Sequence, residues 1–84
     1  MSGWLVYIIR ASDNSLYTGI TTDLERRFAE HQSGKAGAKY FRGRTPKEII
    51  YVEPAHSRSS ASVREAEIKK LSRADKLRLI DAAR

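Results

Sequence analysis

Apolar residues near the start of the chain form two short blocks with polar residues between them. The block from Trp4 to Ile9 is continuous and rich in β-branched and aromatic side chains, which is typical of a strand buried on both faces. Residues 12–15 (Ser-Asp-Asn-Ser) are turn formers, and residues 16–20 make a second strand-like block. The alternation of these blocks predicts an antiparallel β-hairpin.

The length of the hairpin turn decides whether Tyr7 and Tyr17 share a face of the sheet. A two-residue turn would place them on opposite faces, because successive strand side chains alternate. A three-residue turn at residues 13–15 pairs Ile9 with Gly19 and places both tyrosines on one face. A lone tyrosine here is typical of a half-buried sheet aromatic. A glycine inside a strand, as at Gly19, indicates a bulge or the close approach of another group.

The first helix is expected between two local signals. Thr22 as N-cap and Glu25 three residues later form a capping box. The helix should run from there to Ser33 and end at Gly34, because glycine readily adopts the left-handed conformation of a helix terminus. Residues 34–44 then form a glycine-rich basic loop with room for a short helical turn.

The second half of the chain adds one strand and two helices. A third strand is expected at residues 48–53 between Pro46 and Pro54, a helix at 59–71, and a last helix from the N-cap Ser72 to Ala82. The order β-β-α-β-α-α predicts one α+β domain over residues 1–84, in which helices flank a small three-stranded, mostly antiparallel sheet.

The apolar stripe of the first helix includes two cationic residues. Leu24 and Phe28 set the stripe, and helical spacing places Arg27 and His31 on it as well. In one interpretation Arg27 extends along the edge of the stripe and His31 makes a satisfied buried contact. In the other, both side chains point into a groove beside the sheet and face a phosphate.

A carboxylate interrupts the apolar stripe of the long second helix in the same way. That stripe is set by Ala61, Ile68 and Leu71. Glu65 falls on it, whereas Glu67 lies on its flank. Glu65 could pair with Lys69 four residues on, or close a capping box with Ser62. The third interpretation is that Glu65 is a metal ligand at the surface of the sheet.

The net charge of the chain indicates which class of partner it binds. The 84-residue chain carries a formal net charge of +6, so a polyanion is expected, with nucleic acid first. No apolar run is long enough to cross a membrane, and we see no secretory signal. With no cysteine and only 2 histidines, disulfides are excluded and a zinc centre is disfavoured. A cytoplasmic location is expected.

The basic residues form two clusters. One cluster, with interleaved aromatic residues, consists of Lys35, Lys39, Tyr40, Phe41, Arg42 and Arg44. The other consists of Lys69, Lys70 and Arg73. Any single lysine is typical of a solvated surface, but basic residues interleaved with aromatic ones favour binding to a nucleic-acid backbone.

The ordered motifs resemble the GIY-YIG nuclease family. They are Val6-Tyr7-Ile8, Tyr17-Thr18-Gly19, Arg27 and His31 on one helix, and Glu65 on a later one. The resemblance covers nearly the whole chain, is strongest over residues 16–44 and 64–73, and is closest to the small stand-alone bacterial members. The first motif reads Val-Tyr-Ile instead of Gly-Ile-Tyr, and the second has threonine at its centre.

The resemblance implies a metal-dependent DNA endonuclease, structure-selective and active in repair or recombination. It implies a site built from Tyr7, Tyr17, Arg27 and Glu65, with His31 as an accessory. Glu65, or alternatively Glu67, would bind Mg²⁺ or Mn²⁺. Arg27 would clamp the phosphate. A tyrosine would orient or deprotonate the attacking water, with its own pKa lowered or with an acceptor such as His31 nearby.

Partners and competing functions follow from the same interpretation. DNA is the expected partner, with RNA or a larger repair complex as further possibilities and no membrane. One alternative function is a non-catalytic nucleic-acid-binding module on a GIY-YIG scaffold. The other is a structural interaction protein, which would show no salt-dependent binding to nucleic acid.

Overall fold

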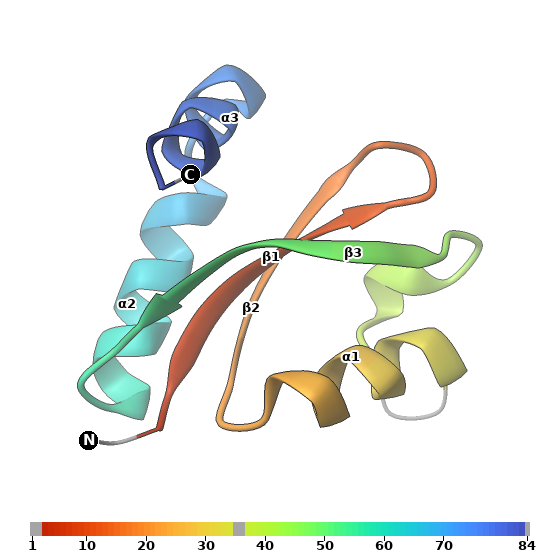
Figure 1. Cartoon of the computed structure of the whole chain (residues 1–84), viewed down its shortest axis with the longest axis horizontal. Helices are drawn as coiled ribbons and strands as arrows, with labels where there is room; N and C mark the ends of the chain where they lie inside the picture. The colour runs from red at the N-terminus through yellow and green to blue at the C-terminus, as the bar shows by residue number, and fades with distance from the viewer. Residues whose placement is uncertain (1–2, 35–36, 84) are drawn as a thin grey trace.

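The computed structural model of the chain describes residues 3–34 and 37–83. The elements follow one another as β1 (Leu5–Ala11), β2 (Leu16–Thr21), α1 (Leu24–Ser33), the 3₁₀ turn η1 (Lys39–Phe41), β3 (Pro46–Pro54), α2 (Arg58–Lys69) and α3 (Arg73–Ala82). The predicted order β-β-α-β-α-α and the α+β class are confirmed (Figure 1).

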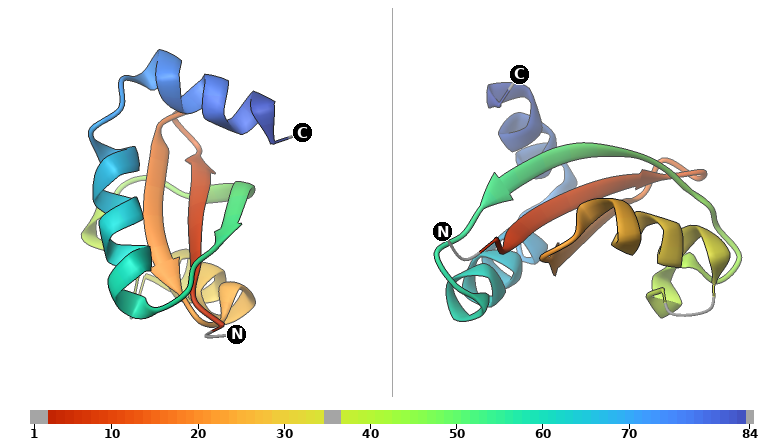
Figure 2. Two further views of the ribbon diagram at one scale, coloured as in Figure 1. Left: turned by 90° about the vertical axis from the view of Figure 1, so that its left-hand side faces the viewer. Right: turned by 60° about the horizontal axis from the view of Figure 1, so that its bottom comes forward.

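The sheet has three antiparallel strands in the order β2-β1-β3, so β1 is central. Residues Val6 to Ile9 of β1 are at most 1% exposed, and this explains why the strand is apolar without alternation. α2 and α3 lie together at one end of the molecule, and α1 and η1 lie at the other (Figures 1 and 2).

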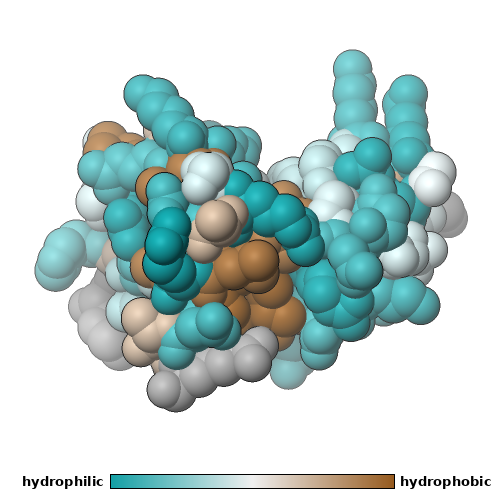
Figure 3. Space-filling view, turned by 90° about the horizontal axis from the view of Figure 1, so that it is seen from above, coloured by the Kyte–Doolittle hydropathy of each residue, from teal (hydrophilic) through white to brown (hydrophobic). Residues whose placement is uncertain are grey.

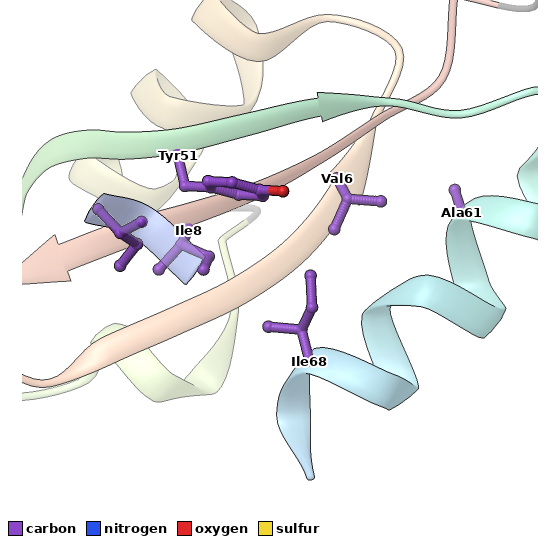
Figure 4. Packing of buried hydrophobic residues seen from close by; sticks show 6 residues of the cluster. Val6, Ile8, Tyr51, Ala61 and Ile68 are labelled. Carbon is purple, nitrogen blue, oxygen red and sulfur yellow. The ribbon is translucent and has the colours of Figure 1, made fainter. Parts of the chain in front are cut away.

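Two apolar cores cover the two faces of the sheet. One core contains Val6, Ile8, Tyr51, Ala61, Ile68 and Ile80, so it joins the sheet to α2 and α3 (Figure 4). The other contains Tyr7, Ile9, Ala11 and Phe41, with Leu24 and Phe28 of α1 packed against it. The alternation of side chains along β1 therefore sends each face of the strand to a different helix.

The hairpin turn begins one residue earlier than predicted. The Ala11 N–H donates to the Ser15 carbonyl at 2.9 Å, and Asn14 adopts the left-handed conformation at φ 66°. Tyr7 consequently pairs with Gly19, and Ile9 pairs with Tyr17, so the predicted pairing of Ile9 with Gly19 is wrong. The turn still has three residues. Because it lies one residue earlier, each residue of β1 pairs with a residue of β2 two positions away from the predicted one. A change of two positions leaves each side chain on its predicted face.

The start of α1 differs from the prediction. The N-cap is Asp23, whose side chain accepts the Arg26 N–H at 3.1 Å, so the expected Thr22 cap is wrong. A carboxylate at this position also interacts favourably with the positive end of the helix dipole. The predicted end of the helix is confirmed, because Gly34 has φ 74° and its N–H donates to the Glu30 carbonyl.

The caps of the later helices can be compared in the same way. α2 is capped by Ser57, which forms a reciprocal box with Ser60, and this excludes the Ser62–Glu65 box. α2 therefore begins slightly earlier than predicted and ends at Lys69. The predicted Ser72 cap of α3 is confirmed, because its side chain accepts the Asp75 N–H at 3.1 Å.

Hydrophilic side chains dominate the surface seen from above, where a small apolar patch lies in a hollow between two hydrophilic lobes (Figure 3). The large apolar side chains that are most exposed include Val52, Val63 and Leu77. Among the described residues, no helix is long and apolar enough to cross a membrane.

Candidate active site

His31 lies at the centre of the candidate site and is only 2% exposed. Its Nδ1 accepts the backbone N–H of Ala38 at 3.1 Å, and its Nε2 lies 2.9 Å from the Tyr7 hydroxyl. Burial and the nearby charge of Arg27 lower the pKa of His31 to about 4, so the imidazole is neutral at pH 7.

The tautomer of His31 follows from its backbone partner. An amide N–H can only donate, so Nδ1 carries no proton and Nε2 must carry it. His31 therefore donates to the Tyr7 oxygen. The sequence interpretation offered His31 as an acceptor for a tyrosine proton, as an alternative to a lowered tyrosine pKa, whereas the hydrogen bonds make His31 a donor to Tyr7.

Tyr7 reaches the site because Gly19 has no side chain. A Cβ at Gly19 would lie 2.5 Å from the Tyr7 hydroxyl oxygen and 2.7 Å from the adjacent ring carbon. The Tyr7 ring thus leans across β2, its cross-strand neighbour, and is itself only 1% exposed. The close approach predicted at Gly19 is confirmed, and it is the Tyr7 ring that approaches.

The other candidate site residues affect the pKa of the Tyr7 hydroxyl. Burial raises its pKa above the usual range, and Tyr17 raises it further. Hydrogen bonding to Arg27 and the charge of that residue lower the pKa, whereas the charge of Glu65 raises it. Tyr7 therefore stays neutral at pH 7 and lies within the electrostatic reach of Tyr17, Arg27 and Glu65.

Aromatic rings enclose this group of residues. The Tyr17 ring centroid lies 6.2 Å from that of Tyr7 and 5.2 Å from that of His31. Phe41 of η1 contacts both His31, at 4.8 Å, and Tyr17, at 5.1 Å. Tyr7 and Tyr17 thus share one face of the sheet, as the three-residue turn predicted.

Arg27 is held by a partner that the sequence interpretation missed. Its guanidinium forms an ion pair with Glu30 at 2.9 Å, and its side chain is 28% exposed. The spacing of three residues on one helix was the available signal. The partly exposed, oriented guanidinium can bind an anion beside Tyr7.

Two further contacts to this site were missed because they involve the backbone. The Ala38 N–H binds His31, and a Cβ at Gly37 would lie 2.7 Å from the His31 Cα. The segment that leads into η1 is therefore packed tightly against the end of α1.

Glu65 and Glu67 occupy different environments on α2. The Glu65 side chain is 22% exposed and pairs with Lys69 at 3.3 Å, which confirms the expected i,i+4 contact. Glu67 is 60% exposed and pairs with Arg64 at 3.4 Å. The charge of Glu65 contributes to the raised pKa of Tyr7, and the charge of Glu67 is not among the causes of that rise.

The carboxylate chemistry fits a single hard cation. No group of three or more histidine, cysteine, aspartate or glutamate residues that could hold a metal ion occurs among the described residues. Mg²⁺ is commonly held by one or two carboxylates together with substrate phosphates and keeps several waters, so the single carboxylate of Glu65 fits this cation. Lys69, its ion-pair partner, is 52% exposed at its side chain and can move away.

The basic residues predicted to bind nucleic acid lie on both sides of this site. Lys39 and Arg42 are exposed on or beside η1, and Lys69, Lys70 and Arg73 are exposed near the end of α2. Arg44 is half-buried and, besides its ion pair with Asp13 at 3.4 Å, lies over the Tyr40 ring at 4.3 Å. Lys35 lies outside the described residues.

Comparisons with known proteins agree with this arrangement. Residues 3–78 match the model of the GIY-YIG catalytic domain. A UPF0213 protein of Natronomonas pharaonis is 56% identical over 75 residues, covering 89% of this chain and 87% of that protein. The UPF0213 protein YhbQ of Escherichia coli K12 is 48% identical, covering 95% of this chain and 79% of that protein.

A solved structure is also similar. The solution NMR structure of a UPF0213 protein from Bacillus halodurans is 44% identical and superposes with a TM-score of 0.60, covering 94% of this chain and 83% of that one. The family match spans most of the chain, including both tyrosine motifs, Arg27 and Glu65. The chain therefore belongs to the GIY-YIG nuclease family, as a small protein of the UPF0213 type.

Proposed function

We propose that this protein is a metal-dependent endonuclease that hydrolyses DNA phosphodiester bonds and selects DNA by its shape, in repair or recombination. The observation that supports the proposal is the Tyr7–His31 hydrogen bond with the Tyr17 ring beside it, together with the effect of Arg27 and Glu65 on the pKa of Tyr7. These groups come from α1, α2 and both strands of the hairpin. Tyr17, Arg27 and Glu65 nevertheless all affect the pKa of Tyr7.

Arg27 is the residue best suited to hold the scissile phosphate. Its planar guanidinium can donate two parallel hydrogen bonds to phosphate oxygens. Glu30 and Tyr7 orient it from the protein side. A group held in place in this way stabilises developing negative charge without rearranging during the reaction.

The two tyrosines take different roles. Tyr7 is buried and its oxygen accepts a hydrogen bond from His31 Nε2–H, so Tyr7 remains neutral and orients Arg27. Tyr17 is half-buried and is the more accessible phenol, so it is the one that contacts the attacking water. His31 holds Tyr7 in position and does not accept its proton.

Glu65 would hold Mg²⁺ or Mn²⁺ beside this group. A divalent cation bound there supplies Lewis-acid polarisation of the phosphate and stabilises the leaving oxygen. GIY-YIG nucleases as a family generally use divalent metals, and this agrees with the single carboxylate.

A second candidate function is a nucleic-acid-binding module without cleavage. The observation that favours it is that both charged site residues have ion-pair partners on their own helix, Arg27 with Glu30 and Glu65 with Lys69. Catalysis requires that substrate and cation compete with these pairs. Partly exposed pairs of this kind contribute little, about 0–1 kcal/mol, so the competition is feasible.

The deciding experiment uses duplex, single-stranded, flap and junction DNA with Mg²⁺ or Mn²⁺. We expect cleavage by the wild-type protein and a loss of about 10²- to 10⁴-fold in rate for Glu65→Gln. Glu67→Gln is the matched control, because Glu67 is exposed on the same helix, and it should retain activity. Unchanged cleavage by Glu65→Gln, or DNA binding without any cleavage by the wild type, would contradict the proposal.

A further inference from the structure

We propose that Arg44 and Tyr40 form a stacking platform for an unpaired DNA base next to the bond that is cut. The inference rests on the proposed function and names the class of substrate, DNA with a single-stranded or extruded nucleotide at the site. It assigns Arg44 a role different from that of the neighbouring basic residues, which contact phosphates.

The contacts of Arg44 fix the plane of its guanidinium. Its Nε pairs with Asp13 at 3.4 Å, and one terminal nitrogen donates to the Ser15 hydroxyl at 3.3 Å. The Ser15 contact is a hydrogen bond through an N–H group, which lies in the guanidinium plane, and the Asp13 contact is an ion pair. The Tyr40 ring lies against the group, with its centroid 4.3 Å from the Arg44 Cζ.

These contacts leave part of the flat guanidinium exposed. Asp13 and Ser15 contact the nitrogens of the guanidinium, and the Tyr40 ring lies against it. The Arg44 side chain is still 33% exposed. Asp13 offsets part of the positive charge of Arg44. A guanidinium stacked on an aromatic ring is well suited to stack on a nucleobase.

The platform is anchored to two rigid parts of the fold. The segment before β3 is bound to the hairpin turn, because the Ser12 N–H donates to the Thr45 carbonyl at 2.8 Å and the Thr45 N–H donates to the Ser12 hydroxyl at 3.0 Å. Figure 1 shows that segment beside the β1–β2 turn. Arg44 is therefore preorganised, because it lies next to a residue that two hydrogen bonds hold to the hairpin turn.

The position of Tyr40 joins the platform to the candidate site. The Tyr40 and Tyr17 ring centroids are 5.2 Å apart, and Tyr17 contacts His31 at 5.2 Å. A nucleotide whose phosphate binds Arg27 would thus place a neighbouring base near Tyr40. A base inside a duplex exposes only its edges in the grooves, so stacking on this platform requires an unpaired base.

The test measures binding in metal-free buffer with EDTA, so that cleavage does not interfere. The probes are a single-stranded oligonucleotide containing 2-aminopurine and a fully paired duplex of the same sequence. Arg44→Lys keeps the charge and removes the plane, and we expect it to lose 2-aminopurine quenching and about 5- to 100-fold in affinity for the single strand, with little change for the duplex. Arg78→Lys, the same substitution at an exposed position of α3 that has no proposed part in binding, should bind like the wild type.

A second pair of variants covers the case in which Arg44→Lys fails to fold. Tyr40→Phe keeps the ring beneath the guanidinium and should retain quenching, whereas Tyr40→Leu removes the ring and should lose it. Wild-type quenching and affinity in both Arg44→Lys and Tyr40→Leu, or equal losses on single strand and duplex, would overturn the inference. A protein that quenches the base but never cuts DNA would overturn the proposed function alone.

Discussion

At the scale of single residues, His31 connects three parts of the chain through its two ring nitrogens. One nitrogen binds the backbone that leads into η1, and the other binds Tyr7 of β1. The ring also packs against Phe41 at 4.8 Å. Protonation would place a second donor opposite the Ala38 N–H, so the folded state favours the neutral ring.

Stability should therefore fall as the pH falls through the range of this histidine. The pKa of His31 is about 4 in the folded protein and 6.5 as the usual value, so the unfolded state binds the proton first. The stabilisation is complete above pH 6.5 and is lost progressively between pH 6.5 and 4, by up to about 1.4 kcal/mol per pH unit. Urea unfolding at pH 7, 6 and 5 measures this slope. The exposed His56 is the control, and a flat slope in His56→Gln would contradict the assignment to His31.

Thr18 offers a second residue-level test. It is 2% exposed, and its hydroxyl finds no hydrogen-bond partner among the residues that the structure describes. Thr18→Val replaces this hydroxyl with a methyl group of similar shape, so we expect the free energy of unfolding to rise by about 1 kcal/mol. The measurement is urea denaturation at pH 7.

Thr21 is the matched control for that substitution. It is 4% exposed on the same strand, but its hydroxyl oxygen accepts the Asp23 N–H at 3.1 Å. Thr21→Val should therefore lower the free energy of unfolding by about 1 kcal/mol. Equal changes in the two variants would show that the hydroxyl of Thr18 is satisfied.

At the scale of elements, the setting of α2 determines where Glu65 points. Ala61 and Ile68 face the core, and helical spacing puts Glu65 on one flank of this stripe and Arg64 on the other. Arg64 binds Glu53 of β3 at 2.9 Å. Glu53 in turn accepts the buried Tyr51 hydroxyl at 2.6 Å. The helix is thus fastened to β3 on the side opposite to Glu65.

Arg64→Met should weaken the attachment of α2 to β3, because it removes the ion pair with Glu53. We expect a loss of about 1 kcal/mol in unfolding free energy, because the pair is partly exposed, and a several-fold higher Mn²⁺ concentration for half-maximal DNA cleavage. Mn²⁺ titration of the cleavage rate measures the effect. Glu67→Gln removes the other partner of Arg64 and should leave the titration unchanged. An identical Mn²⁺ requirement in wild type and Arg64→Met would contradict a positioning role.

Sequence patterns predicted the elements well because those patterns are local. The apolar run of β1, the periodic stripes of α1 and α2, and Gly34 and Ser72 at helix ends each follow from neighbouring residues. The Thr22 cap was wrong because Asp23, one residue later, caps the helix by accepting the Arg26 N–H. The hairpin register depends on which position of the turn Asn14 occupies in its left-handed conformation. The sequence alone allows more than one such position.

The site itself was only partly predictable. Arg27 and Glu65 stood out because charged residues interrupt apolar stripes. The contact of Ala38 with His31 and that of Gly37 with α1 involve the backbone, which carries no sequence signature. The pairing of Arg44 with Asp13 joins residues distant in the chain, so only the folded structure identifies it.

At the scale of the whole molecule, the net charge of +6 and the two basic clusters predict salt-dependent DNA binding. If about five phosphates are contacted, the logarithm of the affinity for duplex DNA should fall against the logarithm of salt concentration with a slope of about −4 to −5. Fluorescence anisotropy between low and moderate salt measures this slope. Lys39→Gln should make it shallower by about 0.9, whereas a slope near zero would favour a protein-interaction role.

The two apolar cores have a consequence for how the protein could be divided. The guanidinium belongs to the helix on one side of the sheet and the carboxylate to the helix on the other, and β1 lies between the two cores. Neither the amino-terminal half, which ends near Gly34, nor the carboxy-terminal half contains both groups. The proposed chemistry therefore requires the whole fold, because a fragment that ends near Gly34 would hold the guanidinium without the carboxylate.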